Sequence, residues 1–169
     1  MPANAPSIHL AENRDQQRWD AYVADHPDAS PYHFFSWKRA VEDAYGHRCF
    51  YYLAEEDGRL VGILPMVHLH LPGLVNELCA LPYCDVGAGL SDSDLVQDAL
   101  LTEALNLKKR LGSNKLTLRG PLRDTVVQRT SFQVEATGKV RMLLPLPGSA
   151  EALFAGFKSK LRSQIRKAE

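Results

Sequence analysis

The spacing of apolar residues predicts two helices near the start of the chain. Between residues 14 and 23 the apolar side chains recur at i, i+3 and i+4, as in an amphipathic helix. The pattern from His33 to Tyr45 predicts a second helix, which Gly46 would terminate. Residues 1–12 are rich in Pro, Ala and Asn and are expected to form a flexible tail.

The period then changes from that of a helix to that of a strand. Residues 49–54 and 59–71 alternate as two antiparallel strands would, and Asp57-Gly58 between them is typical of a hairpin turn. A third strand is predicted over residues 76–81, and the glycine-containing segment 82–90 is expected to be a loop.

The second half of the chain predicts further helices and short strands. A helix should begin after Asp92 or Ser93 and end at Gly112, with a strand following over 115–119. A hairpin is predicted over 132–144, and a last helix should run from Ser149 to the end. This order of elements predicts an α+β fold with a mainly antiparallel central sheet flanked by helices.

Length and charge refine this outline. The 169 residues fit one domain, which we place at 13–157. The 20 basic and 20 acidic residues are unevenly distributed, because residues 158–169 contain five basic residues and one acidic residue. That segment has a net charge of +4 and the rest of the chain −4. Residues 158–169 are therefore predicted to be a basic helix.

Several protein classes are excluded by composition. No run approaches the roughly 18–20 apolar residues of a membrane-spanning helix, and the N-terminus lacks the pattern of a secretory signal, so a cytoplasmic protein is expected. The three cysteines lack C-x-x-C spacing, which favours reduced thiols over a disulfide framework or zinc site. The charge of the main domain argues against generic DNA binding.

Six short motifs follow one another in a characteristic order between residues 15 and 169. They are His33-x-x-x-Trp37, Tyr45-Gly46-His47, Gly62-Ile63-Leu64-Pro65-Met66, Leu81-Pro82-Tyr83-Cys84-Asp85-Val86-Gly87-Ala88-Gly89, Leu116-Thr117-Leu118-Arg119 and the stretch from Lys160 to Glu169. In this order they resemble the N-terminal half of FemAB-type proteins, which contain two tandem GNAT-like (N-acetyltransferase-like) domains. The resemblance is strongest to the variety associated with bacterial exopolysaccharide and PEP-CTERM/exosortase systems.

This resemblance implies a GNAT-like, acyl-CoA N-acyltransferase-like domain. It also implies transfer of an acyl or aminoacyl group to an amine of a cell-envelope or exopolysaccharide-related acceptor. The donor would be aminoacyl-tRNA or acyl-CoA, a substrate rather than a bound cofactor. The partner would be a second GNAT-like domain, toward which the basic helix 158–169 would lead, or another copy of the chain. The present chain is not expected to contain a whole active site.

Basic residues near the C-terminus are the first candidate substrate-binding group. On a helix Arg162 and Arg166 share a face, with Lys158 one turn earlier and Lys167 beside them. Guanidinium and ammonium groups at this spacing can bind a diphosphate or the phosphates of tRNA. The alternative is a solvated helix end whose cations complement the helix dipole.

The predicted second helix carries the next candidates. His33 and Trp37 are four residues apart and could flank a substrate ring, with Lys38 adding charge at the rim of the pocket. The alternative is that Trp37 belongs to the core and His33 packs on it or caps the helix.

The glycine-containing loop and the following strand supply Asp85 and Arg119. Gly87-Ala88-Gly89 partly matches the coenzyme A loop [QR]-x-x-G-x-[GA], although Cys84 stands where Gln or Arg is expected. The alternative is a turn whose glycines allow positive φ. Asp85 could bind an incoming ammonium or cap backbone N–H groups, and Arg119 could project into a substrate cleft or pair with a surface acid.

No metal ligand set and no catalytic nucleophile emerges from the sequence. His68 and His70 share a strand face but lack an assigned third ligand, so a polar sheet face is expected and no metal. No G-x-S-x-G or P-loop motif occurs, and catalytic residues are left unassigned. Two other functions stay open: an acyl-CoA-dependent GNAT N-acyltransferase and a non-catalytic interaction domain.

Overall fold

A computed structural model describes residues 5–85, 87–120, 133, 135, 142 and 144–168. The chain divides into two compact units, Met1–Phe132 and Gln133–Glu169, which are described separately. The hairpin predicted over residues 132–144 lies outside the described part, apart from isolated residues. The predicted division at residues 157/158 stays a prediction.

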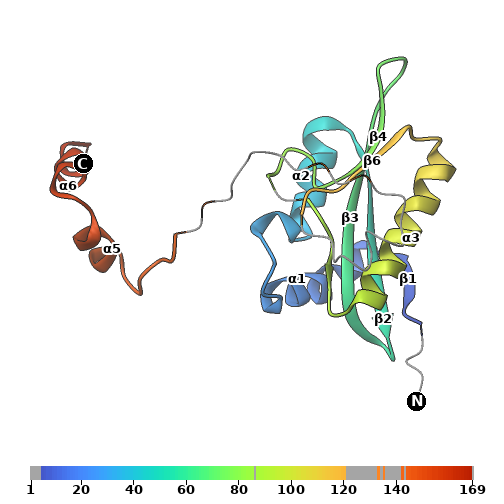
Figure 1. Cartoon of the computed structure of the whole chain (residues 1–169), viewed down its shortest axis with the longest axis horizontal. Helices are drawn as coiled ribbons and strands as arrows, with labels where there is room; N and C mark the ends of the chain where they lie inside the picture. The colour runs from blue at the N-terminus through green and yellow to red at the C-terminus, as the bar shows by residue number, and fades with distance from the viewer. Residues whose placement is uncertain are drawn as a thin grey trace. The chain divides into compact units, whose positions relative to one another are not determined.

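The first unit is built on a six-stranded sheet (Figure 1). Its strands are β1 (Ser7–Leu10), β2 (Arg48–Glu56), β3 (Arg59–Leu71), β4 (Val75–Ala80), β5 (Leu90–Ser91) and β6 (Lys115–Thr117). The strand order is β1-β2-β3-β4-β6, with β5 paired to β3. All pairs are antiparallel except β4 and β6, which are parallel. The prediction of a mainly antiparallel sheet is therefore confirmed.

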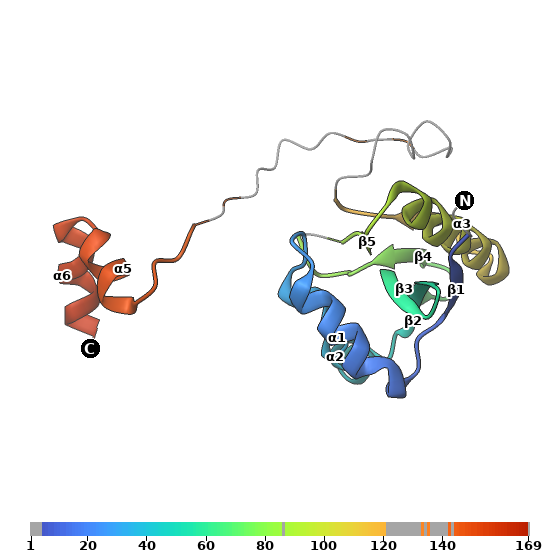
Figure 2. The ribbon, with the colours of Figure 1, turned by 90° about the horizontal axis from the view of Figure 1, so that it is seen from below.

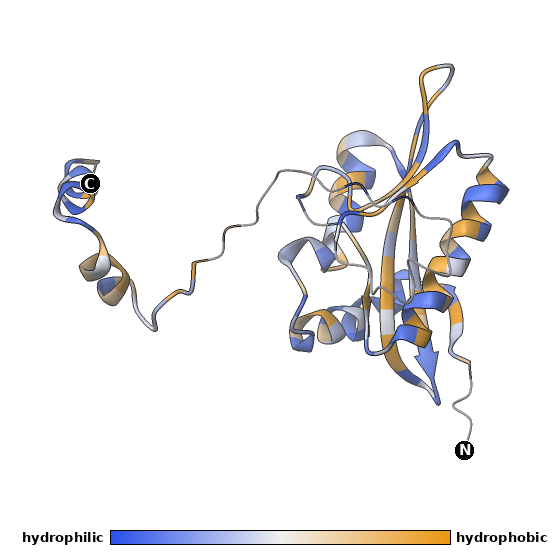
Figure 3. Cartoon of the chain, viewed as in Figure 1, coloured by the Kyte–Doolittle hydropathy of each residue, from blue (hydrophilic) through white to orange (hydrophobic). Residues whose placement is uncertain are grey.

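Helices cover both faces of this sheet (Figure 2). They are α1 (Gln16–Asp25) and α2 (Ser36–Tyr45) on one face and α3 (Asp94–Leu111) on the other, with short 3-10 turns η1 (Asn13–Asp15) and η2 (Pro31–His33). Trp19, Phe35 and Tyr51 belong to the core under α1 and α2, while Leu78 and Leu100 belong to the core under α3. β3 is an almost continuous apolar run because both of its faces are covered (Figure 3).

Local signals account for where the elements begin and end. The Ser93 side chain caps α3 by accepting a hydrogen bond from the Val96 N–H at 3.3 Å. Gly112 ends α3 in the left-handed conformation, with φ of 61°. Asp57 and Gly58 both have positive φ, 49° and 77°, as the tight turn between β2 and β3 requires.

Three predicted segments differ from the structure. Residues 7–10, which were predicted to belong to the flexible tail, form β1 because they pair with the edge of β2 in antiparallel register from Ser7 to Leu10. The second helix begins at Ser36, since Pro31 opens the separate turn η2.

The C-terminal helix is also divided, in the second unit. It consists of α5 (Ala150–Gly156) and α6 (Ser159–Ala168). The extended backbone of Phe157, with ψ of 150°, separates the two helices. The periodicity of apolar residues does not reveal this break, because the same apolar spacing continues across it.

Candidate functional site

The pairing along one edge of β3 is interrupted, and two strands diverge there. β4 and β5 lie along the same edge of β3, with the loop between them leaving the sheet. β6 pairs with β4, but Arg119 beyond it forms a bridge with Gly87 of the loop. The chain just after β6 therefore pairs with the loop between β4 and β5 and not with β5. Among the described residues, β5 and β6 do not pair with each other.

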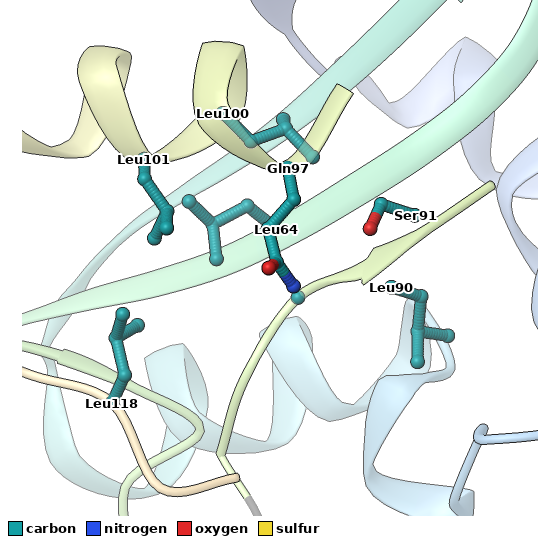
Figure 4. Close-up of a pocket in the computed structure, with 8 residues that line it drawn as sticks. Leu64, Leu90, Ser91, Gln97, Leu100, Leu101 and Leu118 are labelled. Carbon is teal, nitrogen blue, oxygen red and sulfur yellow. The ribbon is translucent and has the colours of Figure 1, made fainter. Parts of the chain in front are cut away.

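A small apolar pocket lies at this divergence (Figure 4). Leu64 of β3, Leu101 of α3 and Leu118 line it together with the backbone of Gly89 and β5. It encloses about 10 Å³, close to the space that one water molecule needs. Strands must separate or side chains must rotate before a longer acyl chain can enter.

A larger, acidic pocket of about 480 Å³ lies on the other side of β5. It is formed by the end of α1 and the turn after it, the start of β3, and the end of β5. Its polar lining residues are Tyr22, Asp25, His26, Asp28, Arg59, Ser91 and Asp92. Three carboxylates face one guanidinium, so the pocket favours a cation. Ser91 lines both pockets, which places them side by side.

Tyr22 and Arg59 fix the carboxylate of Asp92 in this acidic pocket. The Tyr22 hydroxyl donates to Asp92 Oδ1 at 2.9 Å, and Arg59 pairs with Asp92 Oδ2 at 3.2 Å. Burial raises the pKa of Tyr22, and the nearby Asp92 carboxylate raises it further. Tyr22 therefore stays a hydrogen-bond donor at neutral pH. By contrast, among the described residues neither the Asp25 nor the Asp28 carboxylate, both contributed by the α1 side, has an ion-pair partner.

Sequence reasoning missed this acidic pocket. Asp25 and Asp28 follow the first predicted helix and belong to no motif, and the sequence indicates only a helix cap at Asp92. The available signal was the excess of negative charge in the main domain, but only the fold brings residues 25–28 beside residue 92.

His33 lies in the core and joins two segments of the first unit. Only 1% of its surface is exposed. Nδ1 accepts a hydrogen bond from the Ser30 N–H at 3.1 Å, so the neutral ring carries its proton on Nε2, 3.2 Å from the Ala88 carbonyl oxygen. His33 precedes α2, and the shared helical face expected for His33 and Trp37 was therefore wrong.

Trp37 and Lys38 lie in the first turn of α2. The Trp37 ring is partly buried and contacts the edge of Tyr32, with 5.0 Å between the ring centroids. Lys38 pairs with Glu42 at 3.0 Å and lies over Phe35, 5.8 Å from its ring centroid. Trp37 is not among the buried core residues, so the core position considered as its alternative is wrong. A substrate-binding role of Trp37 and Lys38 stays a prediction.

Arg119 links the end of the last strand to the loop between β4 and β5. Its NH2 group donates to the Leu81 carbonyl oxygen at 2.7 Å, and its backbone exchanges two 2.5 Å hydrogen bonds with Gly87. Its Nε is buried and has no hydrogen-bond partner among the described residues. Arg119 thus meets a main-chain carbonyl rather than the surface acid considered as its alternative partner. Asp85, in the same loop, is exposed.

The glycines of this loop are required by close packing rather than by positive φ. Neither Gly87 nor Gly89 belongs to the glycines with positive φ. A Cβ on Gly87 would lie 2.2 Å from the Ala80 carbonyl oxygen, and one on Gly89 would lie 2.6 Å from that of Ile63. The Gly87 N–H already donates to Arg119, so this amide is not available for a pyrophosphate.

Three free thiols occur in the first unit. Cys79 and Cys84 are buried and Cys49 is half-buried. Burial raises the pKa of Cys49 to about 12 and that of Cys84 to about 11. The thiols are therefore protonated at neutral pH, which disfavours them as nucleophiles.

The basic candidates lie on α6 in the second unit. Arg166 and Lys167 are exposed and Arg162 is half-buried. Arg166 lies over the Phe154 ring of α5, 5.3 Å from its centroid. Their role in phosphate binding stays a prediction.

The described residues contain neither a metal-binding cluster nor a membrane-spanning helix. No group of three or more His, Cys, Asp or Glu side chains lies where it could hold a metal ion. His68 and His70 instead stack on each other, and His68 bonds to the Asn76 side chain at 2.8 Å. Within the same residues, no helix is long and apolar enough to cross a membrane.

Comparison with solved structures identifies the fold. A ribosomal-protein-alanine N-acetyltransferase from Brucella melitensis biovar Abortus matches with a TM-score of 0.54 and 16% identity, over 83% of this chain and 100% of that chain. A GNAT family acetyltransferase from Staphylococcus aureus matches with a TM-score of 0.51 and 14% identity, over 83% and 100%. An acetyltransferase from Clostridium acetobutylicum, solved with acetyl-CoA, gives 0.51 and 12%, over 82% and 96%.

At these identities the similarity establishes the fold alone, and the predicted GNAT-like architecture is confirmed. No family model and no curated protein sequence matches the chain.

Proposed function

We propose that the first unit belongs to an N-acyltransferase of the GNAT type that acts on a cationic amine. One observation carries the proposal: an acidic pocket adjoins, through Ser91, the apolar pocket where β5 and β6 diverge. The acidic pocket would hold the acceptor amine, and the apolar pocket, once widened, would take the acyl end of the donor.

The reaction needs little beyond this placement. The bound ammonium first gives one proton to water, which leaves a neutral amine. Its nitrogen then attacks the activated carbonyl carbon, a C–N bond forms, and the C–S bond of a thioester or the C–O bond of an ester breaks. The leaving thiolate or alkoxide takes up the second proton that the nitrogen loses. Positioning the two reactants and stabilising the oxyanion intermediate are the main contributions of such a site. The Arg119 Nε, which is buried and has no partner within the part of the chain that the structure describes, is a candidate donor to that oxyanion.

For the finer assignment we infer an aminoacyl transfer of the FemAB type. The acceptor would be an amine of a cell-envelope or exopolysaccharide precursor and the donor aminoacyl-tRNA, with acyl-CoA as the alternative. The exposed cations Arg166 and Lys167, together with Arg162, support binding of carrier phosphates. A second GNAT-like domain or a second copy would complete the site.

Direct binding of an amine tests the acidic pocket. Spermidine is titrated into the full chain while the ring signals of Tyr22 and His26 are followed by NMR. We expect saturable shifts, and at least tenfold weaker binding in Asp25→Asn/Asp28→Asn, which removes two carboxylates without changing side-chain size. Asp43→Asn, an exposed acid outside the pocket, serves as the control. Equal spermidine affinity in all three proteins would contradict the proposal.

A non-catalytic interaction domain is favoured by a separate observation. Large apolar side chains are exposed in the second unit, where Leu144, Leu146 and Leu161 are 67%, 75% and 42% exposed. Exposed apolar side chains that form one contiguous patch mark a contact surface. Light scattering of the full chain tests this function: a stable dimer lost in Leu161→Asp would support it, and a monomer at all concentrations would oppose it.

A further inference from the structure

Three aromatic rings form an exposed stack on the first unit, away from the residues that line the two pockets. Tyr45 ends α2, His47 follows it, and Tyr83 comes from the loop between β4 and β5. We call this group the aromatic stack. Tyr45 and Tyr83 are 58% and 56% exposed although they contact each other, so parts of their ring faces are open to solvent.

The three rings are nearly parallel and make a flat surface. The Tyr45 and Tyr83 centroids are 4.5 Å apart with 23° between the planes, and His47 is inclined by 14° to Tyr83. His47 Nε2 lies 2.9 Å from the Tyr83 hydroxyl, while the ring centroids are 6.3 Å apart. This combination places imidazole and phenol edge to edge in almost one plane, with Tyr45 against one side.

The backbone conformation that places Tyr83 in the aromatic stack is strained. Tyr83 and nearby Leu81 have φ of 68° and 43°, in the left-handed region that non-glycine residues rarely adopt. Leu81 is fully buried, so the core explains its conformation. The Tyr83 ring, by contrast, is exposed and gains little burial from the strained conformation of Tyr83. Backbone strain retained for an exposed aromatic residue indicates a binding role.

From these observations we propose that the aromatic stack binds a neutral sugar ring. The apolar C–H face of a pyranose can lie on a flat aromatic face, while its hydroxyls reach the polar groups at the rim, here the Tyr83 hydroxyl and the His47 nitrogen. The site would take a pyranose of an oligosaccharide or glycoconjugate.

Two other occupants fit the surface less well. A nucleotide requires a cation for its phosphates. Arg48 follows His47 in the sequence, but its guanidinium lies over the Phe50 ring, 5.1 Å from the ring centroid. A proline-rich peptide docks in a groove between aromatic ridges, whereas these rings are nearly parallel and flat. The proposal goes beyond acyl transfer and does not depend on it, because the binding needs no donor.

Binding of N-acetylglucosamine and its β-1,4 disaccharide tests the proposal by saturation-transfer NMR on the full chain. Adenosine and a proline-rich peptide are run beside them. We expect transfer to the ring protons of the sugars and at least tenfold weaker binding in Tyr83→Ala and Tyr45→Ala. Tyr83→Phe, which keeps the ring but loses the bond to His47, should stay within about threefold of the unchanged protein.

Two further variants separate binding from folding. Tyr83→Gly removes the ring but relieves the positive φ, so it should stay folded and still lose the sugar. Tyr32→Ala removes an exposed tyrosine that contacts Trp37, outside the stack, and should bind normally. The proposal is overturned if neither sugar binds, if only adenosine or the peptide binds, or if Tyr83→Gly binds the sugars as well as the unchanged protein.

Discussion

Gly87 illustrates how a single residue determines the shape of the loop between β4 and β5. Both of its backbone groups bond to Arg119, and its α-carbon lies against the backbone of Ala80. The segment therefore cannot move aside for a side chain. We expect Gly87→Ala to lower the free energy of unfolding by about 1–3 kcal/mol, as overpacking typically does, when measured by urea denaturation.

Gly148→Ala is the control for this substitution, because a Cβ there would meet nothing within 4 Å. It should change the free energy of unfolding by less than about 0.5 kcal/mol. If Gly87→Ala were as stable as Gly148→Ala, the close packing of the loop would be wrong.

A second prediction at the residue scale concerns the Cys84 thiol and the pH dependence of its ionisation. Burial raises its pKa to about 11, so the folded protein keeps the thiol proton that the unfolded chain loses near an ordinary value of about 9. The stability that Cys84 contributes is therefore complete below about pH 9 and is lost as the pH rises toward 11. In Cys49→Ala/Cys79→Ala, the rate of alkylation by iodoacetamide should keep rising to about pH 11. An alkylation rate that stops rising near pH 9 would mean that the Cys84 thiol has an ordinary pKa, and it would contradict this prediction.

At the scale of elements, His33 connects the segment between α1 and α2 to the loop between β4 and β5. His33→Ala would leave the Ser30 N–H and the Ala88 carbonyl oxygen buried without their partner. We expect a loss of about 2–4 kcal/mol in the free energy of unfolding, from two unsatisfied groups, measured by thermal and urea denaturation. Unchanged stability combined with weaker ligand binding would instead support the pocket role predicted for His33 from sequence.

The elements that sequence predicts well are those with a strong local signal. The turn at Asp57-Gly58, the Ser93 cap and the Gly46 and Gly112 stops are all found where the residue types place them. β1 was missed because its pairing with β2, which is distant in sequence, creates it. The turn η2 was missed although its contacts are local: Pro31 opens it, and the His33 side chain accepts a hydrogen bond from the Ser30 N–H. Hydrophobic spacing is the same with or without such partners.

At the scale of the whole molecule, the acidic pocket depends on the topology of the first unit. Asp25 and Asp28 come from the α1 side and Asp92 from the end of β5, and only the pairing of β5 with β3 brings them together. The individual site residues chosen from sequence were spread over α2, the loop, the last strand and α6. Motif order predicted the fold, but motif residues such as His33 and Trp37 were chosen without knowing which side chains the fold buries.

Charge distribution gives a prediction at the same scale. The cations Arg162, Arg166 and Lys167 belong to a segment of net charge +4, so binding of a tRNA to the full chain should weaken steeply with salt. Arg162→Gln/Arg166→Gln should lower tRNA affinity at least fivefold in a filter-binding assay at low salt. The control is Arg39→Gln, an exposed arginine of α2 in the first unit. Equal losses in both variants would indicate non-specific attraction.

The most direct test of the central claim is acyl transfer to an amine by the full chain, alone and with a second GNAT-like domain supplied. Acetyl-CoA or an aminoacyl-tRNA is the donor, spermidine is the first acceptor, and the acylated product is measured by mass spectrometry. The account predicts an amide product with at least one donor, and a KM for spermidine at least tenfold higher in Asp25→Asn/Asp28→Asn than in Asp43→Asn. Absence of product with both donors under both conditions, or an equal KM in the two variants, would contradict it.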